Sequence, residues 1–524
     1  MKIWKKVVAA MTAGMLCLGS VRLSGVENVL KSVGTVLSAS AEEMAETERV
    51  PVGTGTTTVR VGTGTTQLEY EVYNDDTVGI TNCDNDAAGE LEIPAEIDRK
   101  PVTSIGDCAF FSCSSLTEVT IPDRVTSIGV QAFQECNSLI EITIPDSVTS
   151  IEMYAFSNCT SLTKIMMSDS VTTIGDCAFV DCSSLTEITI PDSVTSIGGL
   201  AFSGTPWLTA KQSENPLVII NHILIDGTTC TGSVVIPDNV TNIGVSAFSG
   251  CSSLTEITIS DSVTSIGALA FSDCTSLTEI MISNNVTNIG DCAFFNCSIL
   301  TKITIPDSVT RIGREAFFGC TSLITITIPD SVTVIEDELF FHCSSLSEII
   351  IPNSVTNIGY CVFDSCINLT KVIIPNSVTN IESKAFVECT NLTKITIPDS
   401  VTSIEEDAFS GCDNLTIYGN ADSCAQQYAT ENNIKFALIG TDPTVSKGDL
   451  DGNDTLDSTD IFYTMLYIAN VAVGNDGGLT AEQIAAADVD GNGTVDSTDS
   501  FYIMYYVALR GAGYDTSWEE VLAK

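Results

Sequence analysis

The sequence predicts an elongated solenoid joined to a small helical module, and two repeated patterns lead to this fold class. Phenylalanine recurs every 23 residues across the middle of the 524-residue chain, and self-similarity at a fixed period of this length is typical of solenoids. An acidic segment, 449–460, occurs again as 488–499, and each copy precedes an apolar run long enough for a helix. We expect short parallel strands, turns and short helical segments first, and an all-α module last.

Each repeat is centred on one phenylalanine. The 299 residues from first to last contain 13 steps, and hence 14 repeats, one of them degenerate. In the unit 109–128, Val119 and Ile121 point inward along a strand that Pro122 ends, because proline cannot donate to a strand ladder. A second extended piece and a short helical turn complete the coil. The marker residues are Phe110, Phe133, Phe156, Phe179, Phe202, Phe248, Phe271, Phe294, Phe317, Phe340, Phe363, Phe386 and Phe409.

A single repeat is not expected to be stable alone. About seven buried apolar side chains contribute ~10–20 kcal/mol, whereas ordering one repeat costs ~20–45 kcal/mol of backbone entropy. Stacking adds ladder hydrogen bonds and neighbour packing. At a strand spacing of about 4.8 Å, the stack predicts a rod of about 65 Å.

The repeat unit resembles the leucine-rich repeats of the bacterial surface-antigen (BspA-like) class over 68–440, which implies a leucine-rich-repeat solenoid. Residues 68–101 are expected to form an N-terminal cap of short strands. Residues 415–440 are expected to close the stack with a helix near 423–431 and a strand. In the degenerate repeat, 204–232, we expect a hairpin or irregular strand pair over 218–226. Trp207 there is either a contact residue on a protruding loop or part of a tolerated repeat variant.

We expect most of the cysteines to be packing residues and not metal ligands or partners in disulfides. Twelve of the 20 lie three positions after the phenylalanine, and no Cys-x-x-Cys spacing for a metal occurs. Stacked side chains with parallel directions do not suit a disulfide, so we expect small buried residues. Cys108, Cys177, Cys292 and Cys361 lie two positions before the phenylalanine and are expected to face solvent.

The outward strand positions carry threonine and alternating charge. A glycosidase needs two carboxyl groups in unlike environments, and equivalent repeats offer nearly identical ones, so we expect no enzyme activity. Either a solvated face or a broad ligand-binding surface fits this pattern. Phe295, Phe318 and Phe341 follow the marker residue on consecutive repeats, and they are candidate solenoid contacts if exposed and additional core if covered.

The duplicated acidic segment has the spacing of a calcium-binding loop. Oxygen-bearing side chains stand at loop positions 1, 3, 5, 9 and 12, and the carbonyl at position 7 completes a shell that suits Ca²⁺. Residues 448–469 and 487–508 are identical at 14 of 22 positions. We therefore predict two Ca²⁺ ions, one held by Asp449, Asp451, Asn453, Thr455, Asp457 and Asp460 and the other by Asp488, Asp490, Asn492, Thr494, Asp496 and Asp499.

These loop–helix motifs resemble a type I dockerin over 448–511. The resemblance implies that a cohesin module of a scaffoldin is the partner, in a cellulosome that degrades plant polysaccharides. Asp454 replaces the usual glycine and is expected to weaken the first site. Because both halves carry the same residues, we expect two docking orientations, and Trp518 is expected to fold back onto the module. The partner-binding candidates are Ser458, Thr459, Phe462, Tyr463, Ser497, Thr498, Phe501 and Tyr502.

Net charge, histidine content and the placement of apolar runs disfavour several classes of function. The net charge is −45, which disfavours nucleic acid as a partner, and two histidines leave little room for histidine-dependent catalysis. A basic start, an apolar run over 7–18 and the small residues 39–41 indicate a signal peptide. No later run is long enough for a transmembrane helix. We expect a secreted, extracellular protein, at the cell surface or attached to a cellulosome of an anaerobic bacterium.

The predicted organisation leaves no room for a conventional catalytic domain. It comprises a signal peptide (1–41), a Gly/Thr-rich flexible segment (42–67), the solenoid with caps (68–440), a linker (441–447), the dockerin (448–511) and a tail (512–524). The favoured function is a non-catalytic cellulosome component whose solenoid binds an unknown protein or glycan. The alternatives are an adhesin for host or neighbouring-cell proteins and a polysaccharide-degrading enzyme subunit.

Overall fold

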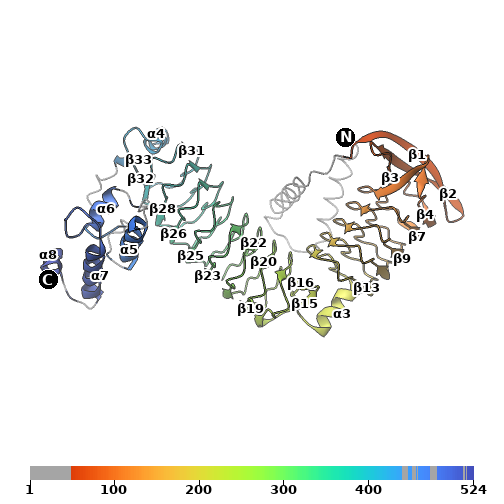
Figure 1. Cartoon of the computed structure of the whole chain (residues 1–524), viewed down its shortest axis with the longest axis horizontal. Helices are drawn as coiled ribbons and strands as arrows, with labels where there is room; N and C mark the ends of the chain where they lie inside the picture. Colours follow the sequence, from red (N-terminus) through yellow and green to blue (C-terminus); the bar gives the residue numbers. More distant parts are fainter. Residues whose placement is uncertain are drawn as a thin grey trace.

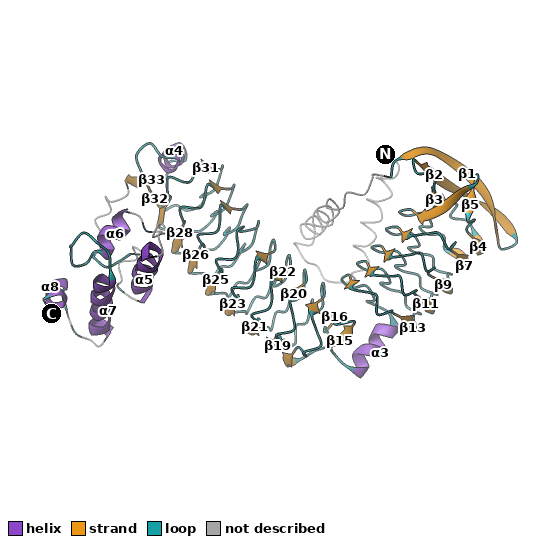
Figure 2. Ribbon diagram, viewed as in Figure 1, coloured by secondary structure: helices purple, strands orange, loops and turns teal. Residues whose placement is uncertain are grey.

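The computed structural model describes residues 49–438, 447–450, 456, 458–472, 479, 481–511, 514 and 516–523. The expected signal peptide and most of the first acidic loop, including Asp454, lie outside the described residues. The chain runs from a strand cap through a curved stack of coils to a helical module (Figure 1, Figure 2). Within the described part, no helix is long and apolar enough to cross a membrane.

The N-terminal cap begins earlier than expected. A long antiparallel hairpin of β1 and β2 turns at Gly62, whose φ is +51°. Residues 51–67 are therefore not the flexible segment that their Gly/Thr composition suggested: threonine and valine favour strands, and β1 pairs with β2 along its length. The cap strands are β1 (Pro51–Val61), β2 (Gly64–Tyr73), β3 (Val78–Cys83), β4 (Ala88–Glu92), β5 (Glu96–Ile97) and β6 (Lys100–Ile105).

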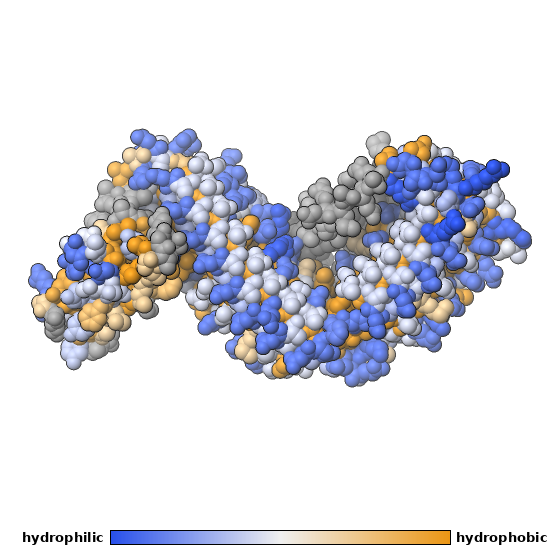
Figure 3. All heavy atoms as spheres, in the orientation of Figure 1, coloured by the Kyte–Doolittle hydropathy of each residue, from blue (hydrophilic) through white to orange (hydrophobic). Residues whose placement is uncertain are grey.

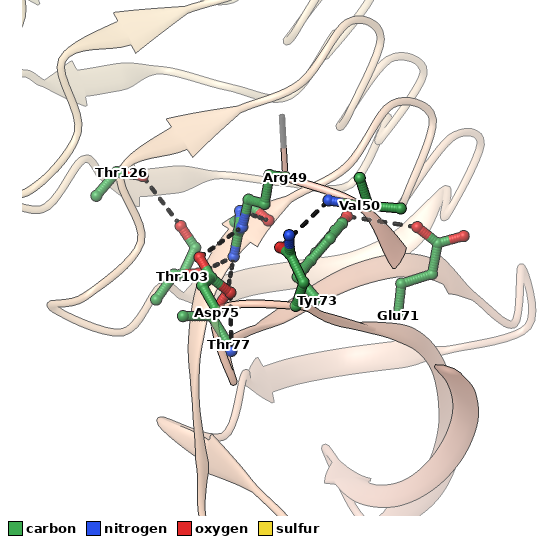
Figure 4. Close-up of polar contacts among 10 residues, drawn as sticks. Arg49, Val50, Glu71, Tyr73, Asp75, Thr77, Thr103 and Thr126 are labelled. Carbon is green, nitrogen blue, oxygen red and sulfur yellow. Dashed lines mark hydrogen bonds and ion pairs between the residues drawn. The ribbon is translucent and has the colours of Figure 1, made fainter. Parts of the chain in front are cut away.

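Arg49, the first described residue, contacts this cap through its guanidinium group (Figure 4). Its guanidinium forms an ion pair with Asp75 (Nε–Oδ2 3.3 Å) and donates to Ser104 Oγ at 3.2 Å. The same group lies 4.1 Å from the ring centroid of Tyr73, within the range of a cation–π contact. It also donates to the hydroxyls of Thr77 and Thr103.

Thirteen longer strands lie along one side of the coils and form two parallel ladders, one before the degenerate repeat (β7 to β13) and one after it (β17 to β32). These are β7 (Ser115–Thr120), β9 (Glu141–Thr143), β11 (Lys164–Met166), β13 (Glu187–Thr189), β17 (Gly232–Val235), β19 (Leu254–Thr258), β21 (Glu279–Met281), β23 (Lys302–Thr304), β25 (Thr325–Thr327), β26 (Glu348–Ile350), β28 (Lys371–Ile373), β30 (Lys394–Thr396) and β32 (Thr416–Gly419).

Two-residue strands form the other side of the coils, where they pair in three separate parallel ladders. They are β8 (Ser127–Ile128), β10 (Ser150–Ile151), β12 (Thr173–Ile174), β14 (Ser196–Ile197), β18 (Asn242–Ile243), β20 (Ser265–Ile266), β22 (Asn288–Ile289), β24 (Arg311–Ile312), β27 (Asn357–Ile358), β29 (Asn380–Ile381) and β31 (Ser403–Ile404). They are the second extended piece expected in each repeat.

The 23-residue period sets the register in which the strands of successive coils pair. Ile165 pairs in parallel with Ile142 and Ile188, its equivalents 23 residues away on either side. The marker phenylalanines are buried and form two continuous ladders, with ring centroids 4.9–5.7 Å apart and planes within 17° of parallel. The predicted solenoid core is confirmed.

The segment carrying the phenylalanine is made of turns, not of the short helical turn expected. Cys108 and Ser112 on either side of Phe110 have φ of +56° and +57°, and left-handed residues interrupt a helix. The N–H of Phe110 instead donates to the carbonyl of Ala132 at 2.7 Å. Each turn is therefore hydrogen-bonded to the next coil.

The degenerate repeat divides the stack into two. Helix α3 (Pro206–Glu214) and an antiparallel hairpin of β15 (Val218–Ile220) and β16 (Ile223–Asp226) replace one coil, and the hairpin prediction is confirmed. One hydrophobic core ends at Ile223 and the next begins at Leu224. The stack changes direction beside α3 (Figure 1), so the rod expected from stacking is bent at the degenerate repeat.

The closing cap matches its prediction. Helix α4 (Cys424–Glu431) begins after Ser423, whose hydroxyl accepts from the N–H of Gln426, as an N-cap should. Strand β33 (Lys435–Leu438) then pairs in parallel with β32. Tyr428 places its ring 5.8 Å from Phe409 at 68°, which covers the end of the aromatic ladder.

Candidate functional site: the C-terminal module and the solenoid surface

The C-terminal module is built on two equivalent helices. Helices α5 (Ser458–Ala472) and α7 (Ser497–Gly511) each begin at the serine of a Ser-Thr pair, 39 residues apart, as expected. Between them lies α6 (Ala481–Ala487), and α8 (Trp518–Leu522) ends the described chain. A small core of Leu450, Tyr463, Ala487, Val489 and Ile503 holds these elements together.

The second acidic loop gathers three carboxylates. Oxygens of Asp488, Asp490 and Asp499 all lie within 4.8 Å of one another, so a cation bound among them would offset their mutual repulsion. Gly491 and Gly493 have φ of +75° and +88°, so the chain turns back at residues that tolerate this conformation. The donor set is entirely oxygen, which fits Ca²⁺ and not a thiolate-preferring metal.

Backbone N–H groups orient these carboxylates. Asp499 is fully buried, and its two oxygens accept from the N–H of Asp490 (3.2 Å) and of Asp496 (2.9 Å). Asp488 accepts from Asn492 and Gly493 at 2.9 and 2.8 Å. Burial raises the pKa of Asp499, so a bound cation would hold this carboxyl in its charged form.

Thr494 and Asp496 complete the described part of the predicted set. Both are exposed, and Asp496 accepts the N–H of Thr498 at 2.7 Å, which lowers the pKa of its carboxyl. The structure brings Asp488, Asp490 and Asp499 together, and the ligand roles of all six residues of this loop stay predictions.

The first loop is described only at its ends. Asp449 and Asp460 are fully buried, and the N–H of Leu450 donates to Asp460 Oδ1 at 2.7 Å. The two halves are linked directly, since the N–H of Gly448 donates to the carbonyl of Ala486 at 2.9 Å. The predicted ligands Asp451, Asn453, Thr455 and Asp457 lie outside the described residues.

The tail folds back onto the module, as predicted. The Trp518 ring stacks on Tyr506 of α7, with centroids 4.6 Å apart. A Cβ on Gly448 would approach the Trp518 ring to 2.6 Å, and the φ of Gly448 is +87°. Glycine is therefore required where the module begins. Ser517 and Glu520 form a reciprocal capping box at the start of α8.

An apolar surface occurs once on each of the two helices. Phe462 and Met465 on α5 are 55% and 57% exposed, and their equivalents Phe501 and Met504 on α7 are 53% and 49% exposed. Large apolar side chains exposed in this way mark interaction sites. Figure 3 shows apolar residues concentrated over this module, whereas the visible face of the solenoid is mostly polar.

The structure divides the partner-binding candidates. Phe462 and Phe501 are exposed, as are Ser497 and Thr498. Tyr463 is buried and Tyr502 packs against the same core, so both tyrosines support the helices from inside. The sequence analysis missed Met465 and Met504, although their spacing of three residues from the phenylalanines on a helix was a usable signal.

The aromatic stripe on the solenoid is a stack of rings. Phe295, Phe318 and Phe341 are half-buried, and successive centroids are 4.7 Å apart with planes within 13° of parallel. Each ring therefore covers the face of its neighbour. The stripe presents ring edges to solvent, a finding that lies between the two expectations of exposed contact and additional core.

Trp207 is not an exposed contact residue. It is 7% exposed, and its ring lies 4.9 Å from that of Phe202 at 55°. At the first turn of α3 it closes the N-terminal phenylalanine ladder. Burial of an indole where stacking ends explains why this repeat carries tryptophan.

The cysteines of the repeat are buried donors. Cys136 Sγ lies 3.2 Å from the carbonyl of Phe110, and the same contact recurs in most repeats. Burial raises the pKa of Cys136 to about 12, so this thiol stays protonated. All nineteen described cysteines are free. Cys292 and Cys361, expected to face solvent, are buried, and the Sγ of Cys292 lies 3.8 Å from Glu315 of the next repeat.

Comparisons with known proteins agree with this geometry. The chain matches the family described as "BspA type Leucine rich repeat region (6 copies)" over 93–209, 220–347 and 288–416, more than half of its length. It matches "Dockerin type I domain" over 447–508. No curated protein matches the chain.

Several solved structures are similar to the solenoid. A leucine-rich repeat protein from Bacteroides ovatus is 28% identical, with 71% of this chain and 98% of that one covered and a TM-score of 0.37. A leucine-rich cell surface protein from Faecalibacterium prausnitzii is 30% identical, with 71% and 97% covered and a TM-score of 0.35.

Leucine-rich repeats bind proteins, and type I dockerins are calcium-binding modules that dock to cohesins; neither is catalytic. The chain belongs to the BspA-type leucine-rich repeat family and carries a type I dockerin domain at its C-terminal end.

Proposed function

We propose that this protein is a secreted, non-catalytic binding component of a cellulosome. Its dockerin, holding two Ca²⁺ ions, attaches the chain to a scaffoldin cohesin, and its solenoid binds a protein partner in the setting of plant polysaccharide degradation. The observation that carries the proposal is the pair of equivalent exposed surfaces on α5 and α7, each next to an acidic loop. The proposed segments are the solenoid over 51–438 with its caps and the dockerin over 448–511.

The nature of the exposed side chains supports a largely apolar cohesin contact. Phe462 and Met465 on one helix, and Phe501 and Met504 on the other, are the large side chains in reach of a partner. Buried aromatic and methionine side chains contribute most of the affinity of many interfaces. Because charged groups contribute little here, we expect cohesin binding to vary only weakly with salt concentration.

The internal repeat supports two docking orientations. If α5 and α7 each serve as the main contact surface with equal affinity, removing one surface halves the number of bound arrangements and weakens binding about twofold. Removing both surfaces abolishes it. The Ser458–Thr459 and Ser497–Thr498 pairs are proposed to add hydrogen bonds beside each apolar surface.

Calorimetric titration of a cohesin panel tests this proposal. We expect F462A/M465A and F501A/M504A each to weaken binding about twofold, and the combined variant to lose it. S458A/T459A alone should have an effect no larger than twofold. A large loss from either half alone would contradict two equivalent orientations. F295A on the solenoid is the matched control and should bind like the natural protein.

For the solenoid, the ring stack supports a protein ligand over a glycan. Sugar recognition by aromatic residues uses an open ring face, whereas stacking at 4.7 Å covers both faces of Phe318 and one face each of Phe295 and Phe341. A pull-down from extracellular proteins and from plant polysaccharides, with the full chain as bait, tests this assignment. Retention on polysaccharide that does not depend on added proteins would overturn it.

An adhesin role for host or neighbouring-cell proteins would use the same solenoid surface. Binding of the full chain to whole cells in the absence of any cohesin would favour that role. We favour the cellulosome role because the dockerin supplies the means of attachment.

A further inference from the structure

The dockerin core makes one described contact with the solenoid. Ile373 on β28 is partly buried and packs against the apolar cluster of the C-terminal module. Figure 1 and Figure 2 show α5 beside this part of the stack. Ile373 occupies an outward strand position, ten residues after the marker phenylalanine, so this side chain is covered by the module and not by its own coil.

The sequence departs from the repeat pattern at this position. Most coils carry threonine there, as at Thr304, Thr327 and Thr396. The two consecutive coils that carry isoleucine are those of Ile350 and Ile373, which pair with each other across β26 and β28. Two β-branched apolar residues side by side make an apolar patch, in which Ile373 is partly buried by the module and Ile350, at its edge, is 38% exposed.

A neighbouring lysine is covered as well. Lys371 and Lys164 occupy equivalent positions on the same face, and each forms an ion pair with a glutamate of an adjacent coil. The Lys371 side chain is 15% exposed, whereas that of Lys164 is 42% exposed. Lys371 lies two residues before Ile373 on β28, so its lower exposure agrees with a module that lies over this strand.

The connection between the two parts is short. Residues 439–446 join Leu438 to Lys447, and eight residues span at most about 29 Å. A short connection gives an effective concentration in the millimolar range, so even a weak contact is populated within one chain. The surfaces on α5 and α7 stay exposed in this arrangement.

We propose that the Ile350–Ile373 patch is an intramolecular docking site for the dockerin. The docked module holds the solenoid at a fixed angle to its attachment point, and it does so without blocking the exposed residues on α5 and α7. That docking fixes the angle of the solenoid on a scaffoldin rests on the proposed function. The docking of the two parts of the chain does not rest on it.

The test compares full-length variants. I350T/I373T introduces the residue that most other coils use, so the coil should fold. M166T/M281T is the control and introduces threonine in place of another apolar residue at the equivalent exposed positions of distant coils. We expect I350T/I373T to speed proteolytic cleavage within 439–446 about tenfold, which corresponds to ~1.4 kcal/mol, and to increase hydrogen exchange over β26 and β28. M166T/M281T should behave like the natural protein. Equal cleavage rates in all three proteins would overturn the proposal.

A measurement without substitutions gives a second test. Chelation of calcium should raise hydrogen exchange over β26 and β28, because the unfolded module releases the patch, and leave β11 and β21 unchanged. No change at β28 after the module has unfolded would also overturn the docking. Cohesin binding by I350T/I373T is measured in parallel, and its retention shows that the proposed function stands whether or not docking occurs.

Discussion

Replacing Asp490 by asparagine should have opposite effects with and without calcium. The carboxylate oxygens of Asp488, Asp490 and Asp499 lie within 4.8 Å of one another. At that distance two unit charges repel by about 0.9 kcal/mol in water and about 3.5 kcal/mol at an effective dielectric constant of 20. Asp490 is the most exposed of the three carboxylates, so the value for water is taken as the lower bound for each of its pairs. Asp490→Asn removes two such pairs, and we expect the calcium-free module to gain about 1–2 kcal/mol.

With calcium the sign reverses. Loss of outer-shell partners alone lowers metal affinity 10–100-fold in known sites, so removing a charged ligand should weaken calcium binding by at least about 100-fold, or ~2.7 kcal/mol. Thermal unfolding of the module, followed by circular dichroism at helix wavelengths, gives both numbers when run in chelator and in saturating calcium. Asp123→Asn, at an exposed turn of the solenoid, is the control and should change neither.

The critical result is that Asp490→Asn raises the melting temperature in chelator and lowers it in saturating calcium. If Asp490→Asn lowers the melting temperature in chelator as well as in calcium, the carboxylates do not repel as their positions require. If it binds calcium as tightly as the natural protein, the second loop is not the metal site.

Three further predictions concern the solenoid. Phe271→Ala should cost about 3–5 kcal/mol, measured by denaturant unfolding, because the ring is fully buried between two stacked neighbours; a loss below about 1 kcal/mol would contradict the ladder as core. Gly227→Ala should cost about 1–3 kcal/mol, since its Cβ would lie 2.2 Å from the Phe248 ring, and an unchanged melting temperature would contradict this packing. Burial raises the pKa of Glu338 from 4.5 to about 7, so the folded state holds a proton that the unfolded state has released, and stability should fall as pH rises through that interval; melting curves of Glu338→Gln should lack this component.

The periodic parts of the structure could be predicted because burial repeats with the sequence. A phenylalanine every 23 residues has one arrangement that buries it, so the ladder from Phe248 to Phe409, the strands and the closing cap followed directly. The hairpin of the degenerate repeat followed from preserved spacing. Trp207 was harder to place, since the same residue suits an exposed contact and the end of an aromatic stack.

The turns and the N-terminal hairpin could not be predicted on the same basis. Cys108, Gln131 and Tyr154 occupy the same repeat position and all have positive φ. Their side chains have no common property from which a left-handed conformation could be predicted. The Gly/Thr-rich stretch 51–67 has a composition common to spacers and strands, and only pairing with β2 decides between them.

The candidate site was partly predictable for a similar reason. Acidic residues at fixed spacing identify the loops, because few other structures need oxygen ligands in that order. Helices α5 and α7 are apolar on more than one side, so the sequence does not separate Tyr463 in the core from Met465 at the surface. That distinction comes only from the packing of the two helices.

Binding of the full chain to immobilised cohesins, measured with calcium and after its removal, tests the central claim most directly. The account predicts binding to at least one cohesin in calcium, complete release by chelator, and recovery when calcium is restored. Binding that persists after exhaustive metal removal, with the module still folded, would contradict it.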